Sequence, residues 1–337
     1  MADKYSLEVF FEAKELPDYN FLFSLFNEAS ELLETEVTDY RPSAKDGSYG
    51  GLIEFSDDVP VIVIPDIHGR PGFIRNLLNF IIPDTYKTPA GGLSVLQALE
   101  QSLVYVVCVG DAIHTERTRE RWIEIQSEYE QGIFDGEAMK AEMSVSLCTL
   151  CALIELKKRF KSNFFFLKGN HENILNDFDN GNCAFGKYAE EGSIVKDFIR
   201  VTYGDDILYL ISCYENALPL VFKNKNCIVT HAEPAVIFDR DDAINAWSNP
   251  ELIYGVTWTK NDQVETKTVE AIFKKFLSKK DIKKAIYLGG HRPVRGNFSL
   301  RQDGKYVQIH NPARQNIAIV CSHRKFNPEQ DIFGVEK

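Results

Sequence analysis

The feature that most constrains the fold of this chain is a set of five short apolar runs. Each run is followed closely by a polar residue that can bind a metal or a phosphate. The runs cover residues 61–64, 104–109, 164–167, 227–230 and 285–288 and are rich in Val, Ile, Phe and Tyr. Such composition is typical of buried strands. Helical stretches separate the first three runs, which predicts an α/β organisation. In α/β sheets, ligands bind beyond the carboxyl ends of the strands, so these polar residues are expected to converge.

The residues at the strand ends are carboxylates, an amide and imidazoles. They are Asp66 and His68, Asp111, Asn170 and His171, His231, and His291. This donor set suits borderline divalent ions such as Mn²⁺, Fe²⁺, Co²⁺ or Zn²⁺, and the lack of thiolates argues against a closed structural zinc site. A single His after a strand is more often a turn or core residue. The shared strand-end position and the order of the pieces argue against coincidence.

The motifs at these positions resemble those of the metallophosphoesterase (calcineurin-like) superfamily. They read PDIHG (65–69), GD (110–111), GNHE (169–172), THAEP (230–234) and GGHRPV (289–294). The segments 215–235 and 255–260 are similar to parts of serine/threonine phosphoprotein phosphatases, so that branch, with its bacterial members, is the nearest relative. The resemblance implies an α/β metallophosphoesterase fold, in which a central β-sandwich is flanked by helices on both sides.

The resemblance also implies roles for the motif residues. Asp66 and His68 are expected to bind a first metal ion, Asp111 to bridge two ions, and Asn170, His231 and His291 to complete the second. The implied cofactor is a pair of divalent metal ions. Mn is the metal that we expect first, and Fe, Zn, Co and Mg are the alternatives. The implied reaction is hydrolysis of a phosphomonoester by a metal-bound hydroxide, with Asp111 and His171 as catalytic residues and His171 as the general acid.

The second motif departs from the family pattern. Phosphoprotein phosphatases usually read Gly-Asp-x-x-Asp-Arg-Gly, whereas His114 and Thr115 stand here in place of the second Asp and the Arg. That Asp normally orients the catalytic His, and that Arg grips phosphate. His114 is a candidate catalytic residue that could orient His171 or contact metal or substrate. It could equally be a plain loop residue.

Another arginine could replace the missing phosphate ligand, because a planar guanidinium binds phosphate in a bidentate way. The candidates are Arg292, Arg117, Arg70 and Arg314. Arg292 directly follows a predicted metal ligand, and the alternative for it is a solvated surface residue. Residues 310–320 occupy the place of a loop that borders the active site in the family, which suggests Arg314 as a substrate-binding residue and suggests His310 without giving it a role.

Net charge and composition limit the binding partners and the location that we expect for the protein. The 337-residue chain carries a net charge of −11, so bulk nucleic-acid binding is not expected and an anionic phosphorylated substrate needs a local site. Its odd number of cysteines, seven, favours free thiols in a reducing compartment. The first residues lack the apolar core of a signal peptide, and no apolar run reaches 18 residues. A cytoplasmic location without membrane contact is therefore expected, and the oligomeric state stays open.

We predict three regions along the chain. Residues 1–56 form a helical N-terminal extension, with a helix within residues 19–36, residues 57–323 form the catalytic domain, and residues 324–337 form a tail. A helical insertion at about 115–160 could cap the predicted active-site cleft, form a dimer surface or only add packing to the catalytic domain.

Three functions remain open from the sequence. The first is a phosphomonoesterase acting on a phosphoprotein or a small phosphorylated molecule. The second is a phosphoanhydride hydrolase of the dinucleoside polyphosphate type. The third is a catalytically impaired binding or scaffold module, which the altered second motif motivates.

Overall fold

Two β-sheets lie face to face in the computed structural model, which describes residues 7–336. One sheet has five strands in the order β11-β10-β2-β3-β4 and the other has six in the order β1-β5-β6-β7-β9-β8. The first consists of β2 (Val61–Ile64), β3 (Tyr105–Cys108), β4 (Phe164–Phe166), β10 (Asn316–Val320) and β11 (Ile332–Gly334). The second consists of β1 (Leu52–Glu54), β5 (Val221–Asn224), β6 (Cys227–Val229), β7 (Ile286–Gly289), β8 (Ser299–Arg301) and β9 (Tyr306–Gln308).

The strands β2, β3 and β4 are buried along their whole length because both faces of their sheet are covered. In β2, Val61 and Val63 face the second sheet, whereas Ile62 and Ile64 pack against helices. Successive side chains of a strand point to opposite faces, so a strand between two apolar layers needs an unbroken apolar run. Phe165 fills the space between the sheets, and its ring centroid lies 5.5 Å from that of Phe222.

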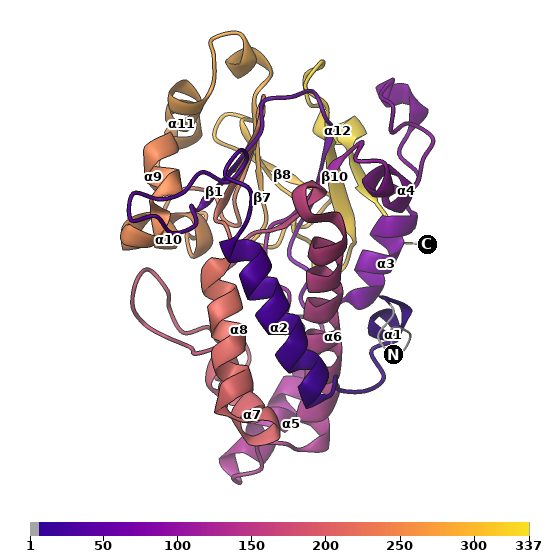
Figure 1. The fold of residues 1–337 in the computed structure, drawn as a ribbon, viewed down its shortest axis with the longest axis vertical. Helices are drawn as coiled ribbons and strands as arrows, with labels where there is room; N and C mark the ends of the chain where they lie inside the picture. Colours follow the sequence, from indigo (N-terminus) through magenta and orange to yellow (C-terminus); the bar gives the residue numbers. More distant parts are fainter. Residues whose placement is uncertain (1–6, 337) are drawn as a thin grey trace.

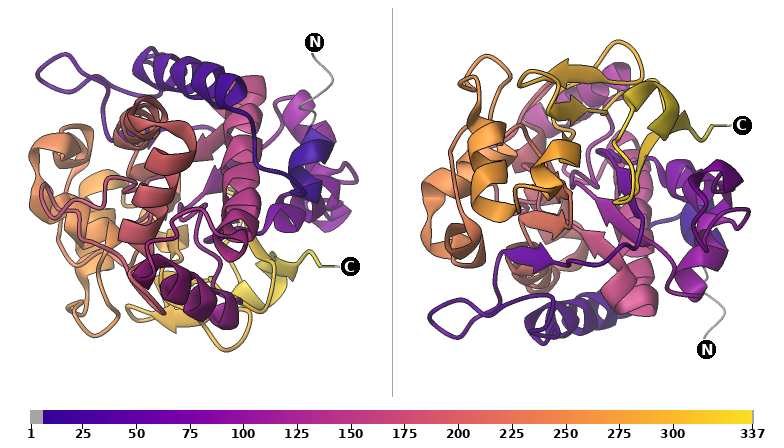
Figure 2. Two further views of the ribbon diagram at one scale, coloured as in Figure 1. Left: turned by 90° about the horizontal axis from the view of Figure 1, so that it is seen from below. Right: turned by 90° about the horizontal axis from the view of Figure 1, so that it is seen from above.

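Helices form the two outer layers (Figures 1 and 2). The five-stranded sheet shares a core with α1 (Leu7–Glu12), α2 (Tyr19–Glu34), α3 (Pro71–Asn79), α4 (Val95–Glu100), α5 (Arg119–Glu130), α6 (Glu137–Phe160), α7 (Glu191–Tyr203) and α8 (Asp205–Ala217). The six-stranded sheet is covered by α9 (Arg240–Ile244), α10 (Pro250–Thr257) and α11 (Thr268–Phe276), and the short α12 (Pro328–Asp331) precedes β11. In Figure 2 the orange segment with α9–α11 lies on the side opposite the purple α3 and α4.

The predicted fold class is confirmed: a central sandwich carries helices on both outer sides. All five predicted strand runs contain strands, and residues 19–36 contain α2. The runs do not form one open sheet, because β2, β3 and β4 belong to one sheet while β6 and β7 belong to the other.

The division into extension, catalytic domain and tail stays a prediction, although both end regions contribute strands. β1 pairs in parallel with β5, and β11 pairs antiparallel with β10. Within the predicted insertion, α6 packs against β4 and against α1, α2 and α3, which is the packing role among the three that the sequence left open. The seven cysteines are free. No helix among residues 7–336 is long and apolar enough to cross a membrane.

Candidate active site

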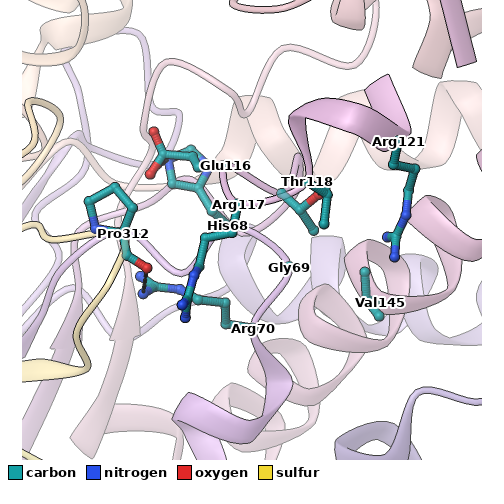
Figure 3. A pocket seen from close by; sticks show the side chains of 10 residues that line it. His68, Gly69, Arg70, Glu116, Arg117, Thr118, Arg121, Val145 and Pro312 are labelled. Carbon is teal, nitrogen blue, oxygen red and sulfur yellow. Dashed lines mark hydrogen bonds and ion pairs between the residues drawn. The ribbon is translucent and has the colours of Figure 1, made fainter. Parts of the chain in front are cut away.

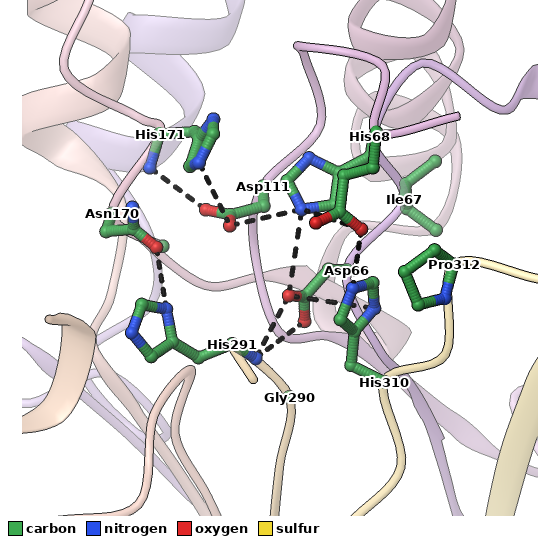
Figure 4. Close-up of polar contacts among 12 residues, drawn as sticks. Asp66, Ile67, His68, Asp111, Asn170, His171, Gly290, His291, His310 and Pro312 are labelled. Carbon is green, nitrogen blue, oxygen red and sulfur yellow. Dashed lines mark hydrogen bonds and ion pairs between the residues drawn. The ribbon is translucent and has the colours of Figure 1, made fainter. Parts of the chain in front are cut away.

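The predicted metal ligands meet where the carboxyl ends of strands from both sheets come together (Figure 4). The side chain of Asp111, which follows β3, lies at their centre. Its Oδ2 atom lies 3.5 Å from His68 Nε2 and 3.5 Å from His231 Nε2. Asp111 is therefore placed between two groups of ligand atoms, as a bridging carboxylate must be.

The first group consists of Asp66, His68 and Asp111, which come from the loops after β2 and β3. His68 Nε2 lies 3.8 Å from Asp66 Oδ2, and all three side chains are buried. The two loops are tied together by backbone bonds, since the His68 and Gly69 N–H groups donate to the carbonyls of Asp111 and Ala112 at 2.8 Å each.

The second group consists of Asn170, His231 and His291, with Asp111 shared. His231 Nε2 and His291 Nδ1 lie 2.9 Å and 2.8 Å from Asn170 Oδ1, and 3.2 Å from each other. Ligands about 2.1 Å from one ion lie roughly 3–4 Å apart when the angle between them is about 90–140°. The spacings in both groups are thus close to those around a single ion.

Two of the histidine rings are held in the tautomer that a cation requires. His68 Nδ1 lies 2.9 Å from the His114 carbonyl, and His231 Nδ1 lies 3.1 Å from the Val109 carbonyl. A carbonyl accepts a hydrogen bond, so Nδ1 carries the proton and Nε2 keeps its lone pair directed towards Asp111.

The electrostatics of the site also fit cations. Burial lowers the pKa of His68, and it lowers that of His231 to about 4, so these rings are neutral as metal ligands must be. Burial, with the charges of Asp66 and Glu172, raises the pKa of the Asp111 carboxyl well above its ordinary value. Two divalent cations would offset this repulsion between carboxylates, so the residues present fit the pair of ions that the sequence implied.

Strained backbone holds these side chains in place. His68, Asp111, His114 and His291 all have positive φ, at 47°, 55°, 68° and 61°. This left-handed conformation is costly for residues with a Cβ and persists where the surrounding structure enforces it. Gly290, one residue before His291, leaves room for a ligand, because a Cβ there would lie 1.9 Å from Asp66 Oδ1.

The last residue of the GNHE motif, Glu172, braces the loops and was given no role from the sequence. Its buried carboxylate accepts hydrogen bonds from the N–H groups of Asp111 at 2.8 Å, Ala112 at 2.9 Å and Gly169 at 2.8 Å. Glu172 thereby joins the loop that carries Asp111 to the loop that carries Asn170. The position of Glu172 inside the GNHE motif was the only sequence signal for such a role.

His114 contacts the predicted general acid directly. The Nδ1 atoms of His114 and His171 lie 2.9 Å apart, and the ring of Phe185 stacks on His171 at 4.6 Å between centroids. The His171 N–H donates to Asp111 Oδ1 at 2.9 Å. Among the alternatives left open for His114, this geometry favours the orienting role. Burial lowers the pKa of both rings.

A cavity of about 490 Å³ opens beside His171 and the second ligand group. Cationic and aromatic side chains line it: Arg292, Lys187, Lys260, Tyr254, Trp258 and Phe185. The Nε atom of Arg292 is buried without a hydrogen-bond partner among the described residues. Arg292 is therefore the predicted arginine that lies best for an anionic substrate.

The other three candidate arginines lie elsewhere. Arg117 is exposed and lines a separate cavity of about 180 Å³ beside His68 (Figure 3). Arg314 is exposed and donates to Asn297 Oδ1 at 2.6 Å. Neither of these two lines the larger cavity, so their predicted contact with substrate stays a prediction.

Arg70 bonds to the backbone of two loops beside the site. Its guanidinium donates only to backbone carbonyls, at 2.7–3.3 Å: those of Asp66, Ile67, Asn311, Pro312 and Arg314. A guanidinium bonded in this way joins the loop after β9 to the loop after β2. Contact of Arg70 with a substrate phosphate stays a prediction.

Sequence reasoning gave His310 no role, yet it belongs to the site. It is fully buried, and its Nδ1 lies 3.7 Å from Asp66 Oδ2. It follows β9 by two residues, as His291 follows β7, and these two strands pair in parallel. The strand-like run YVQI (306–309) directly precedes His310, and this was the signal that could have found it.

Comparison with known proteins agrees with this geometry. A family model described as calcineurin-like phosphoesterase matches residues 59–323, which is more than half of the chain, so the chain belongs to this family. A search of curated proteins found no significant match.

Solved structures share the fold at low sequence identity. One is a protein serine/threonine phosphatase from Saccharomyces cerevisiae with similarity to human phosphatase PP5; it is 13% identical with a TM-score of 0.58, over 94% of this chain and 89% of that chain. Another is a cold-active protein tyrosine phosphatase; it is 14% identical with a TM-score of 0.50, over 83% and 80%. At these identities the likeness shows the fold alone.

Proposed function

We propose that this protein is a phosphatase that hydrolyses phosphomonoesters with two divalent metal ions. The observation that carries the proposal is the pair of ligand groups that share Asp111, whose Oδ2 lies 3.5 Å from a histidine Nε2 on either side. Asp66 and His68 would hold the first ion with Asp111, and Asn170, His231 and His291 the second. When bound, such ions polarise the phosphate and lower the pKa of a coordinated water.

The chain's own residues supply the remaining parts of the reaction. Arg292 and Lys260 line the cavity beside the second ligand group and would bind the substrate phosphate. His171 would donate a proton to the leaving oxygen, and the 2.9 Å contact with His114 would fix its ring. Phe185, stacked on His171, excludes water from one face of the ring. Positioned acids of this kind contribute about 10²–10⁴-fold to a rate.

The cavity also bears on the kind of substrate. At about 490 Å³ it falls within the range of pockets for small molecules and for single side chains of a protein. It would therefore accept a small phosphorylated molecule or one phosphorylated side chain, and both remain within the proposal. The seven free thiols support the expected cytoplasmic location, and Mn²⁺ is the metal that we propose to test first.

The test is a set of rate measurements on an aryl phosphate, phosphopeptides, nucleotides and a dinucleoside polyphosphate. Each is made with Mn²⁺, Mg²⁺, Zn²⁺ or a chelator. We expect metal-dependent release of phosphate from monoesters and no turnover with the chelator. Preferential cleavage of the dinucleoside polyphosphate would replace the proposal by the phosphoanhydride alternative, and no turnover of any substrate would favour the scaffold alternative.

A further inference from the structure

We propose that His310 is a ligand of the first cation through Nδ1 and that Glu116 positions its ring. This inference rests on the proposed two-metal function. The sequence motifs provide three protein ligands for the first ion, Asp66, His68 and Asp111, but four for the second. His310 would raise the first set to four, from a strand that carries none of the recognised motifs.

The position of His310 fits a ligand of this ion. Atoms of Asp66, His68 and His310 that can bind a metal all lie within 4.8 Å of one another. His310 Nδ1 lies 3.7 Å from Asp66 Oδ2, almost the same distance as the 3.8 Å between that oxygen and His68 Nε2. Figure 4 shows contacts from the Asp66 carboxylate to the rings of both His68 and His310. Both spacings are those of two ligands around one ion.

The hydrogen bonding of His310 leaves Nδ1 without a proton. Its Nε2 lies 2.7 Å from Glu116 Oε2, so Nε2 carries the proton and donates it to the carboxylate. The Nδ1 atom is buried and has no hydrogen-bond partner among the described residues. A ring nitrogen therefore faces a carboxylate oxygen in a fully buried place, and a cation bound between them would satisfy both atoms.

Glu116 is itself firmly held. Its Oε1 pairs with Lys187 Nζ at 2.6 Å, and its side chain is only 11% exposed. A carboxylate that accepts the distal N–H of a metal-binding histidine fixes the ring and makes it a better ligand. Glu116 follows the altered second motif directly, so the segment that departs from the family pattern at His114 and Thr115 also brings this carboxylate to the site.

Metal binding by the full chain tests the inference without measuring activity. We would determine Mn²⁺ per chain by plasma mass spectrometry and affinities by titration calorimetry. The unaltered chain is expected to bind two ions. His310→Ala should keep one at unchanged affinity and bind the other at least about tenfold more weakly, and Glu116→Gln should weaken the same ion by about 10–100-fold. His323→Ala removes the seventh histidine, which is exposed and lies outside the site, and should bind both ions normally.

The outcomes separate this inference from the proposed function. Two ions bound with unchanged affinity by folded His310→Ala would overturn the inference and leave the proposed function intact. No ion bound by the unaltered chain would remove the proposed function itself. If circular dichroism shows that His310→Ala is unfolded, a crystal structure of the unaltered chain with Mn²⁺ decides: the inference requires an ion bonded to His310 Nδ1 and fails if that ion is bound without it.

Discussion

At the scale of single residues, histidines dominate the site. Six of the seven histidines of the chain lie in it: His68, His114, His171, His231, His291 and His310. Each has a distinct set of contacts, which separates their roles. Ring nitrogens of the proposed ligands point at carboxylates or at the Asn170 amide oxygen, whereas His114 and His171 contact each other.

Substitution of the proposed acid tests its role. His171→Ala should lower kcat on phosphomonoesters by about 10²–10⁴-fold, because the leaving oxygen would lose its proton donor. Binding of two Mn²⁺ should persist, since His171 belongs to neither proposed ligand set. Steady-state kinetics together with metal analysis measure both quantities. An unchanged kcat would exclude His171 as the acid.

His114 should act through His171. His114→Ala should lower kcat by up to about 10²-fold with KM nearly unchanged, because the ring of His171 would lose the partner that lies 2.9 Å away. His114→Asp should recover much of the loss, since a carboxylate can accept the same hydrogen bond. Kinetics of the three proteins on one substrate make the comparison. Equal kcat values for His114→Ala and the unaltered chain would show that His114 is a plain loop residue.

At the scale of elements, the loops after the strands determine the geometry. The loops after β2, β3 and β4 are joined by backbone bonds and by Glu172, and the loop after β7 reaches Asp66 through the His291 N–H at 2.9 Å. Each strand supplies a rigid origin, and the loops after β2, β3 and β7 turn through residues with positive φ at the site: His68, Asp111 and His291. A change of backbone shape in one loop should therefore disturb ligands that belong to another.

A matched pair of glycine substitutions tests this coupling. Gly290→Ala places a Cβ 1.9 Å from Asp66 Oδ1, whereas a Cβ at Gly296, in the same loop, meets nothing within 4 Å. Gly290→Ala should lower the free energy of unfolding by about 1–3 kcal/mol and weaken metal binding. Gly296→Ala should do neither. Urea unfolding and Mn²⁺ titration of both variants measure the effects, and similar behaviour of the two would contradict the proposed crowding.

Strand and motif patterns predicted most of the site but not all of it. The five apolar runs and the residues after them gave the six proposed ligands, which the structure brings together, because strand ends are set by local sequence. They did not show that the runs belong to two sheets, since pairing depends on contacts far apart in the chain. They also did not show that Arg70 contacts five backbone carbonyls from two separate loops, because no local pattern reports such contacts.

At the scale of the whole molecule, the sandwich buries several histidines in their neutral form. The same side chains exposed to water would take up a proton at a higher pH. Burial lowers the pKa of His231 from 6.5 to about 4. The unfolded chain therefore takes up a proton at higher pH than the folded chain does. The contribution of His231 to the free energy of unfolding is fully present above about pH 6.5 and is lost as the pH falls towards 4.

The metal-free protein should show this pH dependence. In the presence of a chelator, the free energy of unfolding should fall between pH 7 and pH 4, with His231 contributing up to about 3 kcal/mol of the loss. His231→Asn should show a shallower dependence, since one titrating group is removed. Urea unfolding at several pH values measures the slopes. Identical slopes for the two proteins would contradict the burial of a neutral His231.

The central claim is that residues from both sheets hold two cations around Asp111. The most direct test is anomalous diffraction from crystals of the protein grown with Mn²⁺. We predict two peaks about 3.5–4 Å apart, one beside Asp66 and His68 and the other beside Asn170, His231 and His291, with Asp111 touching both. A single peak, or manganese bound only away from Asp111, would contradict the account.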